Sequence, residues 1–314
     1  MRRVFDFRKG TSDSGRVTVV SRMLSWISAV RTRVNQPRVR RYSLGAAALL
    51  LLGGLALSVI NLPAHVGLVR PWLLLMSAGL GVPVAILLTV VETRLSARVL
   101  YVDFDWPTSL RISLLASAAN MLPLPGGPLV RVSSLTGAGA GLRASTAATL
   151  LIALLWIALA TLGAAAGASD DSRAAGAWLA IGGGVIGFFA AGGLYTLSRS
   201  MALVLMTVLA KAAAVVVDVL RIYWVLGALG VEATLRQTAV FSLSGVAGAA
   251  VSIVPSGLGI NEVVAAAIAP LADVASSTAF LATAVNRIAA LAVLLPLVAA
   301  LTIGVRQTTH QRTD

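Results

Sequence analysis

Few ionisable side chains lie within the apolar stretches of this sequence. They are Arg131, Asp218, Arg221, Glu262 and Arg287, with Lys211 expected nearer a membrane interface. A charge at the centre of a membrane helix costs about 2.5–3.5 kcal/mol on insertion scales. Charges that persist there are candidates for function, and we expect them to be paired or hydrated.

Arg131 follows Pro128, where a short helix is expected to begin. Free backbone N–H groups at a helix N-terminus and a guanidinium group together suit an anion, above all a phosphate. Gly126 and Gly127 would let the backbone approach such a ligand closely. The alternative is an ion pair between Arg131 and Glu262.

Glu262 follows Gly257 and Gly259, also at the expected start of a helix. The helix dipole stabilises a carboxylate there, so capping is one interpretation. The other is a site for a cation, a proton or a cationic headgroup, with Arg287 as the partner of Glu262. Hydrogen bonds at this depth are expected from Asn120, Asn261 and Asn286.

Asp218 and Arg221 are three residues apart, so on a helix they share a face and can pair. The simpler interpretation is a local ion pair that lowers the cost of burial. Catalytic chemistry finds little support, because the chain has no cysteine, only two histidines and no nucleophile motif. We therefore expect no enzyme activity, no metal site and no cofactor.

Composition identifies the class of protein. The chain has 314 residues, of which 58% are hydrophobic and 12% are charged, and its mean hydropathy is +0.90. A soluble domain carries about 25% charged residues. The sequence therefore predicts an all-α polytopic membrane protein and excludes a soluble enzyme or a disordered chain. Six apolar runs are long enough to span a bilayer: 42–60, 72–91, 144–168, 174–197, 212–229 and 279–305.

Two further apolar segments, 112–135 and 239–271, are each broken in the middle. The breaks contain Pro123, Pro125 and Pro128 in the first segment, and Pro255, Gly257 and Gly259 in the second. Irregular backbone at membrane depth is tolerated only inside protein or beside a water-filled cavity. We expect two re-entrant helical hairpins in a pseudo-inverted repeat. The Lys/Arg counts of the loops do not decide between re-entry and crossing, but both topologies place the two termini in the cytoplasm.

The net charge of +13 is concentrated near the N-terminus, where residues 1–41 hold eleven of the 25 basic residues. This arm is either an interfacial amphipathic helix on anionic lipid or a solvated segment that orients the protein. No recognition motif accompanies it, so nucleic acid is not an expected partner. The expected organisation is a basic arm (1–41), a transmembrane domain (42–305) and a cytoplasmic tail (306–314).

Two motifs carry a family resemblance. The sequence Asn120-Met121-Leu122-Pro123 with Gly127 and Arg131, and the sequence Pro255-Ser256-Gly257-Leu258-Gly259-Ile260-Asn261-Glu262 with Arg287, resemble the lysylphosphatidylglycerol synthase transmembrane family over roughly residues 42–305. The resemblance implies a bacterial inner-membrane protein that translocates a lipid. The motif positions carried over are Asn120, Pro123, Gly127, Arg131, Pro255, Gly257, Gly259, Glu262 and Arg287. The uncharged run 150–162 departs from the family, and without an aminoacyltransferase domain lysyl transfer is not expected.

These patterns favour a flippase that moves a phospholipid or a lipid-linked anionic headgroup through a midplane cavity. The alternative is a non-transporting protein that presents lipid to, or scaffolds, a membrane glycosyltransferase or acyltransferase. Its basic arm would then serve for docking. The oligomeric state does not follow from the sequence.

Overall fold

The computed structural model describes residues 37–61, 70–120, 126–250 and 259–310, and it contains no strand in these ranges. The chain divides into two units, Met1–Gly45 and Ala46–Asp314. Of the first unit only Pro37–Gly45, the start of helix α2 (Pro37–Ile60), is described. The basic arm up to residue 36 and the break residues Pro123, Pro125, Pro255 and Gly257 lie outside the described residues.

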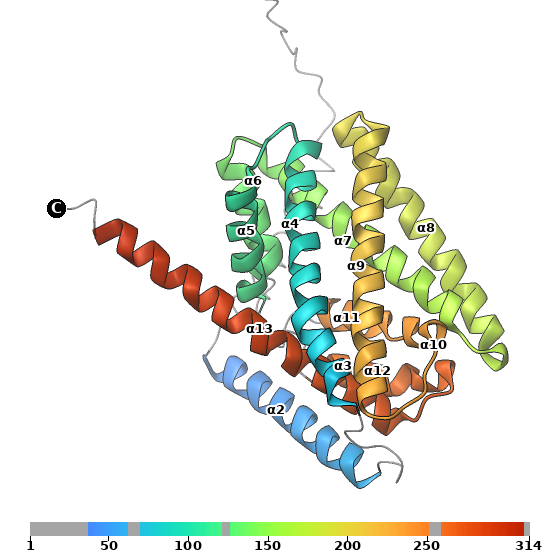
Figure 1. The fold of residues 1–314 in the computed structure, drawn as a ribbon. Coiled ribbons are helices and arrows are strands. Elements are labelled where there is room, and N and C mark those ends of the chain that lie inside the picture. Colours follow the sequence, from blue (N-terminus) through green and yellow to red (C-terminus); the bar gives the residue numbers. More distant parts are fainter. Residues whose placement is uncertain (1–36, 62–69, 121–125, 251–258, 311–314) are drawn as a thin grey trace, which may run out of the picture. The chain divides into compact units, whose positions relative to one another are not determined.

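Five helices are long and apolar enough to cross a membrane. The first is a continuous rod of α3 (Pro71–Met76), a π-helical turn η1 (Ser77–Gly81) and α4 (Val82–Val99). The others are α7 (Leu142–Gly167), the turn η2 (Asp170–Ser172) with α8 (Arg173–Ser198), α9 (Met201–Ala228) and α13 (Ser276–His310). The chain is therefore an all-helical protein with five candidate membrane spans in its described part (Figure 1). The sixth expected span, 42–60, falls in α2, of which Leu51–Ile60 qualifies as a shorter apolar helix.

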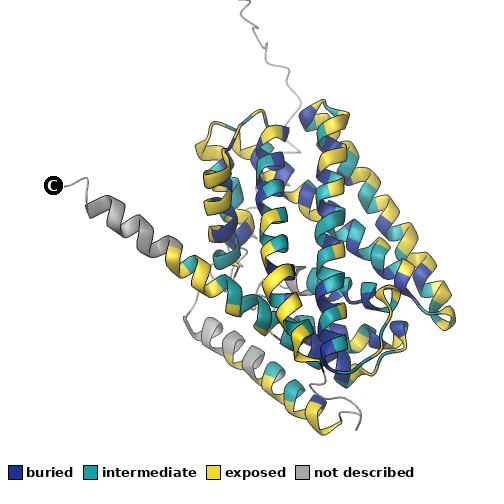
Figure 2. Cartoon of the chain, viewed as in Figure 1, coloured by how far each residue is buried: buried dark blue, intermediate teal, exposed yellow. Residues whose placement is uncertain are grey.

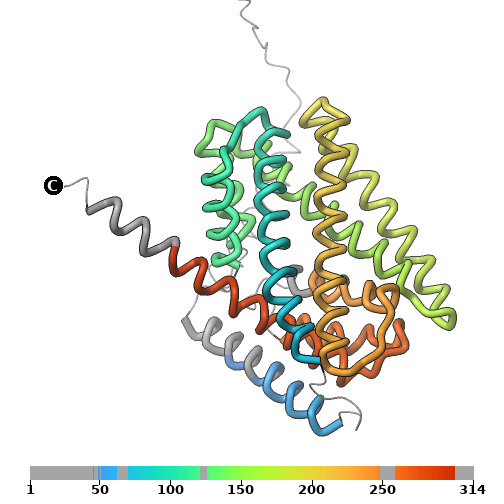
Figure 3. Tube along the Cα trace, viewed as in Figure 1, coloured from blue at the N-terminus to red at the C-terminus, as the bar shows by residue number. Residues whose placement is uncertain are grey.

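Each broken segment forms a pair of helices that pack side by side. The first pair is α5 (Trp106–Ala119) and α6 (Gly126–Gly137), seen as adjacent green coils in Figure 3. In the second segment α10 (Leu235–Ala239) leads into α11 (Ser242–Ala250), which packs against α12 (Ile260–Ile268) and its short extension η4 (Ala269–Ala272). Side-by-side halves form a hairpin, whereas a single crossing would place the two halves end to end.

Helix α9 lies at the centre of the packing. It contacts α3, η1, α4, α7, α8, α10 and α13. Helices α7 and α8 pack together closely at Gly183, where an added Cβ would come within 3.0 Å of the Ala158 carbonyl oxygen. Small residues allow such close approach between membrane helices. Buried and exposed faces run along the long helices (Figure 2). The apolar side chains of Trp178, Phe188 and Phe189 on α8 are exposed, as expected of a surface that faces lipid.

Polar caps hold the two hairpins in place. Asp105 caps α5, because its carboxylate accepts a hydrogen bond from the Thr108 backbone N–H at 3.0 Å. Thr234 and Gln237 form a reciprocal capping box at the start of α10. Arg236 then donates to the carbonyl oxygens of Ala166 and Ala168 at the end of α7, at 2.9 and 3.2 Å. These last carbonyls have no partner within the helix, so the contact joins α10 firmly to α7.

Candidate functional site

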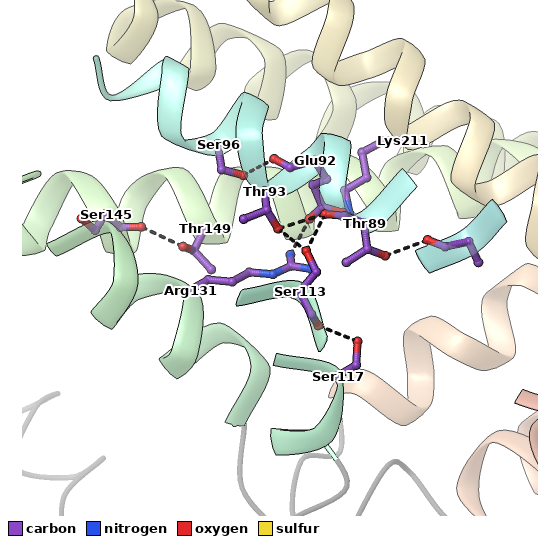
Figure 4. A network of polar contacts seen from close by, with 11 residues as sticks. Thr89, Glu92, Thr93, Ser96, Ser113, Ser117, Arg131, Ser145, Thr149 and Lys211 are labelled. Carbon is purple, nitrogen blue, oxygen red and sulfur yellow. Dashed lines mark hydrogen bonds and ion pairs between the residues drawn. The ribbon is translucent and has the colours of Figure 1, made fainter. Parts of the chain in front are cut away.

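Three ionisable side chains, each from a different helix, are joined by ion pairs inside the protein. Glu92 of α4 places one carboxylate oxygen against Arg131 Nη1 of α6 and the other 2.6 Å from Lys211 Nζ of α9 (Figure 4). The exposed fractions of the Glu92, Lys211 and Arg131 side chains are 7%, 11% and 24%. We call this group the Glu92 triad. One carboxylate therefore bridges two cations that are far apart in the sequence.

The structure corrects two expectations at this point. The alternative that paired Arg131 with Glu262 is wrong, because Arg131 lies against Glu92 of α4, whereas Glu262 of α12 pairs with Arg287 of α13. Lys211 of α9 is buried within the protein. Glu92, which directly follows the expected span 72–91, is buried within the protein, because the helix continues to Val99.

A seam of hydroxyl groups joins α4 to α5 beside the triad. The Oγ atoms of Thr93 and Ser113 lie 2.9 Å apart, and Ser113 also donates to the carbonyl oxygen of Thr89 at 3.2 Å (Figure 4). Within α4, Ser96 donates to the carbonyl oxygen of Glu92 at 2.7 Å. These bonds fix the helix face that presents Glu92.

The Glu92 triad has a net charge of +1 when all three groups are ionised. A buried charge that lacks a counter-charge is strongly destabilising. An anion that reaches Arg131, the most exposed of the three, would balance this charge and compete with Glu92 for the guanidinium group. The arrangement thus suits a phosphate. The attraction comes from the net positive charge of the Glu92 triad, whereas the sequence led us to expect a phosphate at the N-terminus of the helix that carries Arg131.

The N-terminus of α6 is not next to Arg131. The helix starts at Gly126, so Arg131 lies in its second turn and not in the first. Asn120 Oδ1 accepts a hydrogen bond from the Gly127 N–H at 2.8 Å. A Cβ on Gly126 would overlap the backbone of Ala119, and one on Gly127 would overlap the Asn120 side chain. The two glycines therefore allow α5 and α6 to pack closely. Pro128 is tolerated in the first turn of α6, where a backbone N–H has no partner within the helix.

A second ion pair lies where the other hairpin meets the last span. Arg287 Nε of α13 is 2.9 Å from Glu262 Oε1 of α12, and the Glu262 side chain is completely buried. Arg287 is thus the partner of Glu262, as expected. Gly259 has φ of +79°, a conformation that favours glycine, and it precedes α12 so that Glu262 falls in the first turn. Stabilisation of Glu262 by the helix dipole is compatible with this pair.

A third pair links α9 to the second one. Arg221 Nη1 lies 3.4 Å from Asp218 Oδ1, as the three-residue spacing predicts. Arg221 Nη2 also donates to the carbonyl oxygen of Asn286 at 3.4 Å. Lys211 and Asp218 are seven residues apart, which is about two turns or 10 Å along one face of α9. Helix α9 therefore carries a line of charge from the Glu92 triad to the Glu262–Arg287 pair.

A cavity of about 270 Å³ lies at the end of this line. Helices α7, α9, α11, α12 and α13 line it, and its polar lining includes Asp218, Ser242, Ser244, Asn261, Asn286 and Arg287. The Oδ1 atoms of Asn261 and Asn286 are buried without a hydrogen-bond partner among the described residues. Buried amide oxygens normally bind a donor, so a ligand or water is expected there. The Asp218 side chain, which lines this cavity, is 44% exposed.

No matching protein-family model was found for the sequence, and none of the curated proteins matched it. The resemblance to the lysylphosphatidylglycerol synthase transmembrane family therefore stays a prediction that rests on the two motifs. Within the part of the chain that the structure describes, no group of three His, Cys, Asp or Glu side chains is arranged to hold a metal ion.

Proposed function

We propose that this chain moves a phospholipid or another lipid with an anionic headgroup from one leaflet of a membrane to the other. The observation that carries the proposal is the polar cavity bordered by Asp218 and Arg287. A charged headgroup cannot cross hydrocarbon without polar partners. The cavity and the charges along α9 supply such partners, while the acyl chains remain in the surrounding lipid.

In this proposal the two hairpins, α5–α6 and α11–α12, are re-entrant and enter from opposite sides as a pseudo-inverted repeat. Helix α2 is then the sixth span, and both termini are cytoplasmic. The phosphate binds first near Arg131, where the net charge of the Glu92 triad is positive, and the headgroup then passes along α9 to the cavity. The family resemblance adds the location, a bacterial inner membrane.

Leaflet exchange in reconstituted vesicles tests the proposal. Fluorescent phosphatidylglycerol and phosphatidylethanolamine are placed in both leaflets, and a membrane-impermeant quencher reports how fast the inner pool becomes accessible. We expect the wild-type protein to accelerate exchange of at least one lipid over protein-free vesicles. A Glu262→Gln/Arg287→Gln variant removes both charges of one pair together, so that no unpaired buried charge remains. We expect it to fold and to exchange lipid more slowly.

Arg173→Gln is the control, because Arg173 pairs with Asp170 at the surface, where the two side chains are 79% and 75% exposed. It should exchange lipid at the wild-type rate. Wild-type rates in the Glu262→Gln/Arg287→Gln variant would contradict a route through this pair. No acceleration by the wild-type protein, for these lipids or for a polyprenyl-phosphate lipid, would contradict the proposal and favour the lipid-presenting alternative.

A further inference from the structure

A groove that takes no part in the polar route runs along α4, which lies between α5 and α9 (Figure 1). Two hollows form it. One of about 340 Å³ is lined by Arg94, Arg98, Met206 and Leu209, and the other, of about 480 Å³, by Pro83, Leu87, Pro107 and Leu110. Trp106 borders both. The lining residues of α4 extend from Pro83 to Arg98, which is about 22 Å at 1.5 Å per residue.

The two ends of this groove differ in chemistry. The end at Pro83 and Leu110 is apolar, whereas the other end carries Arg94 and Arg98, one turn apart on α4. Trp106, at the start of α5, separates the two parts. Tryptophan and arginine together are typical of the depth at which lipid headgroups lie.

Arg94 is held in place with part of its guanidinium group available. Its Nε donates to the carbonyl oxygen of Phe104 at 3.0 Å, and its Cζ lies 4.6 Å from the centre of the Trp106 ring. No acceptor among the described residues is bound to its two Nη groups. Among the described residues, the Arg98 side chain has only a long contact of 3.7 Å with Asp103, and these side chains are 47% and 77% exposed. Such exposed pairs contribute little, so both arginines are able to bind an anion.

We propose that this groove binds one anionic phospholipid of the bilayer. The phosphate contacts Arg94 and Arg98, and an acyl chain lies along α4 against Pro107 and Leu110. Charge complementarity selects an anionic headgroup, and the length of the apolar part selects a membrane lipid over free phosphate. The bound lipid would join the ends of α4, α5 and α9, and its role is independent of lipid translocation.

The test uses the full chain in neutral detergent with added lipids of identical acyl chains. Thermal shift and native mass spectrometry compare phosphatidylglycerol with phosphatidylcholine, and inorganic phosphate is the third ligand. A ligand that binds only the folded protein raises its apparent melting temperature. We expect phosphatidylglycerol to remain bound and to stabilise the protein, and neither other ligand to do so. Equal effects of the two lipids, or the same shift with phosphate, would overturn the proposal.

Variants locate the site. Arg94→Gln/Arg98→Gln should raise the half-saturating phosphatidylglycerol concentration roughly tenfold or more, because two charged contacts are lost. The matched control, Arg143→Gln/Arg173→Gln, removes two exposed arginines elsewhere and should bind as the wild type does. Leu110→Trp fills the apolar part without altering either arginine, and it should also weaken binding. Wild-type affinity in both groove variants would refute the assignment.

Discussion

Removing the shared carboxylate of the Glu92 triad should destabilise the protein more than removing either cation. In a Glu92→Gln variant, Arg131 and Lys211 both lose their partner, and the net charge of the buried group rises from +1 to +2. Breaking a buried pair by removing one partner costs about 3–5 kcal/mol. At roughly 2–4 °C per kcal/mol for a sizeable domain, we expect the apparent melting temperature to fall by about 6–20 °C.

Lys211→Gln provides the contrast. It leaves the Glu92–Arg131 pair intact and lowers the net charge of the group to zero, so we expect a smaller loss or a gain in stability. Glu92→Gln/Lys211→Gln restores the net charge to +1 and should recover part of the loss. The assay is a melting curve of the purified protein in one detergent at one scan rate, because membrane-protein unfolding is often irreversible. A Glu92→Gln variant as stable as the wild type, or a Lys211→Gln variant that is less stable than Glu92→Gln, would refute the bridging role.

Three further predictions follow from the caps and the second ion pair. Asn120→Ala should lower the free energy of unfolding by about 0.5–2 kcal/mol, because the Gly127 N–H loses its acceptor. Asn120→Asp keeps an acceptor and should lower it less. Equal melting curves for the wild type and both variants would contradict the capping role. Arg287→Gln leaves Glu262 buried and unpaired, so its apparent melting temperature should lie below that of Glu262→Gln/Arg287→Gln; the reverse order would refute the pair. Hydrogen bonds from the side chain and backbone of Thr108 lower the pKa of Asp105 below its ordinary value of 3.8. The stabilisation is thus present above that value and is lost as pH falls through the lower folded-state pKa. Asp105→Asn keeps an acceptor at every pH. Between about pH 6 and pH 3 the variant should therefore lose less stability than the wild type. Equal losses of stability in the two proteins over this range would contradict the cap.

The sequence was sufficient to predict features that depend on local spacing or long apolar runs. The spans after α2, the two hairpins and the Asp218–Arg221 pair belong to this kind, because hydropathy and helical periodicity determine them. The Glu262–Arg287 pair was also expected, although its evidence was only the shared depth of two charges. The route by which lipid would cross remains a proposal.

The Glu92 triad was not predicted, because its members come from three helices whose packing the sequence does not reveal. A hydropathy window ends a span at the first charge, and Glu92 therefore appeared to begin a loop. One signal was present: Thr89, Glu92, Thr93 and Ser96 form a polar stripe at helical spacing directly after the apolar residues 82–88. One of the two interpretations of Arg131 paired it with Glu262, whereas the structure places it against Glu92.

The central claim is that a headgroup passes through the polar cavity, and filling that cavity tests it most directly. A Cβ on Gly245 would lie 3.6 Å from the Trp156 ring, an ordinary contact, so Gly245→Ala should fold and keep the cavity open. Gly245→Leu should fold as well and project its larger side chain into the cavity. Measured side by side in vesicles of one composition, Gly245→Ala should exchange lipid between leaflets at the wild-type rate, and Gly245→Leu should be at least tenfold slower, a difference of about 1.4 kcal/mol in barrier height. Equal exchange rates for the two variants, with both correctly folded, would contradict the account.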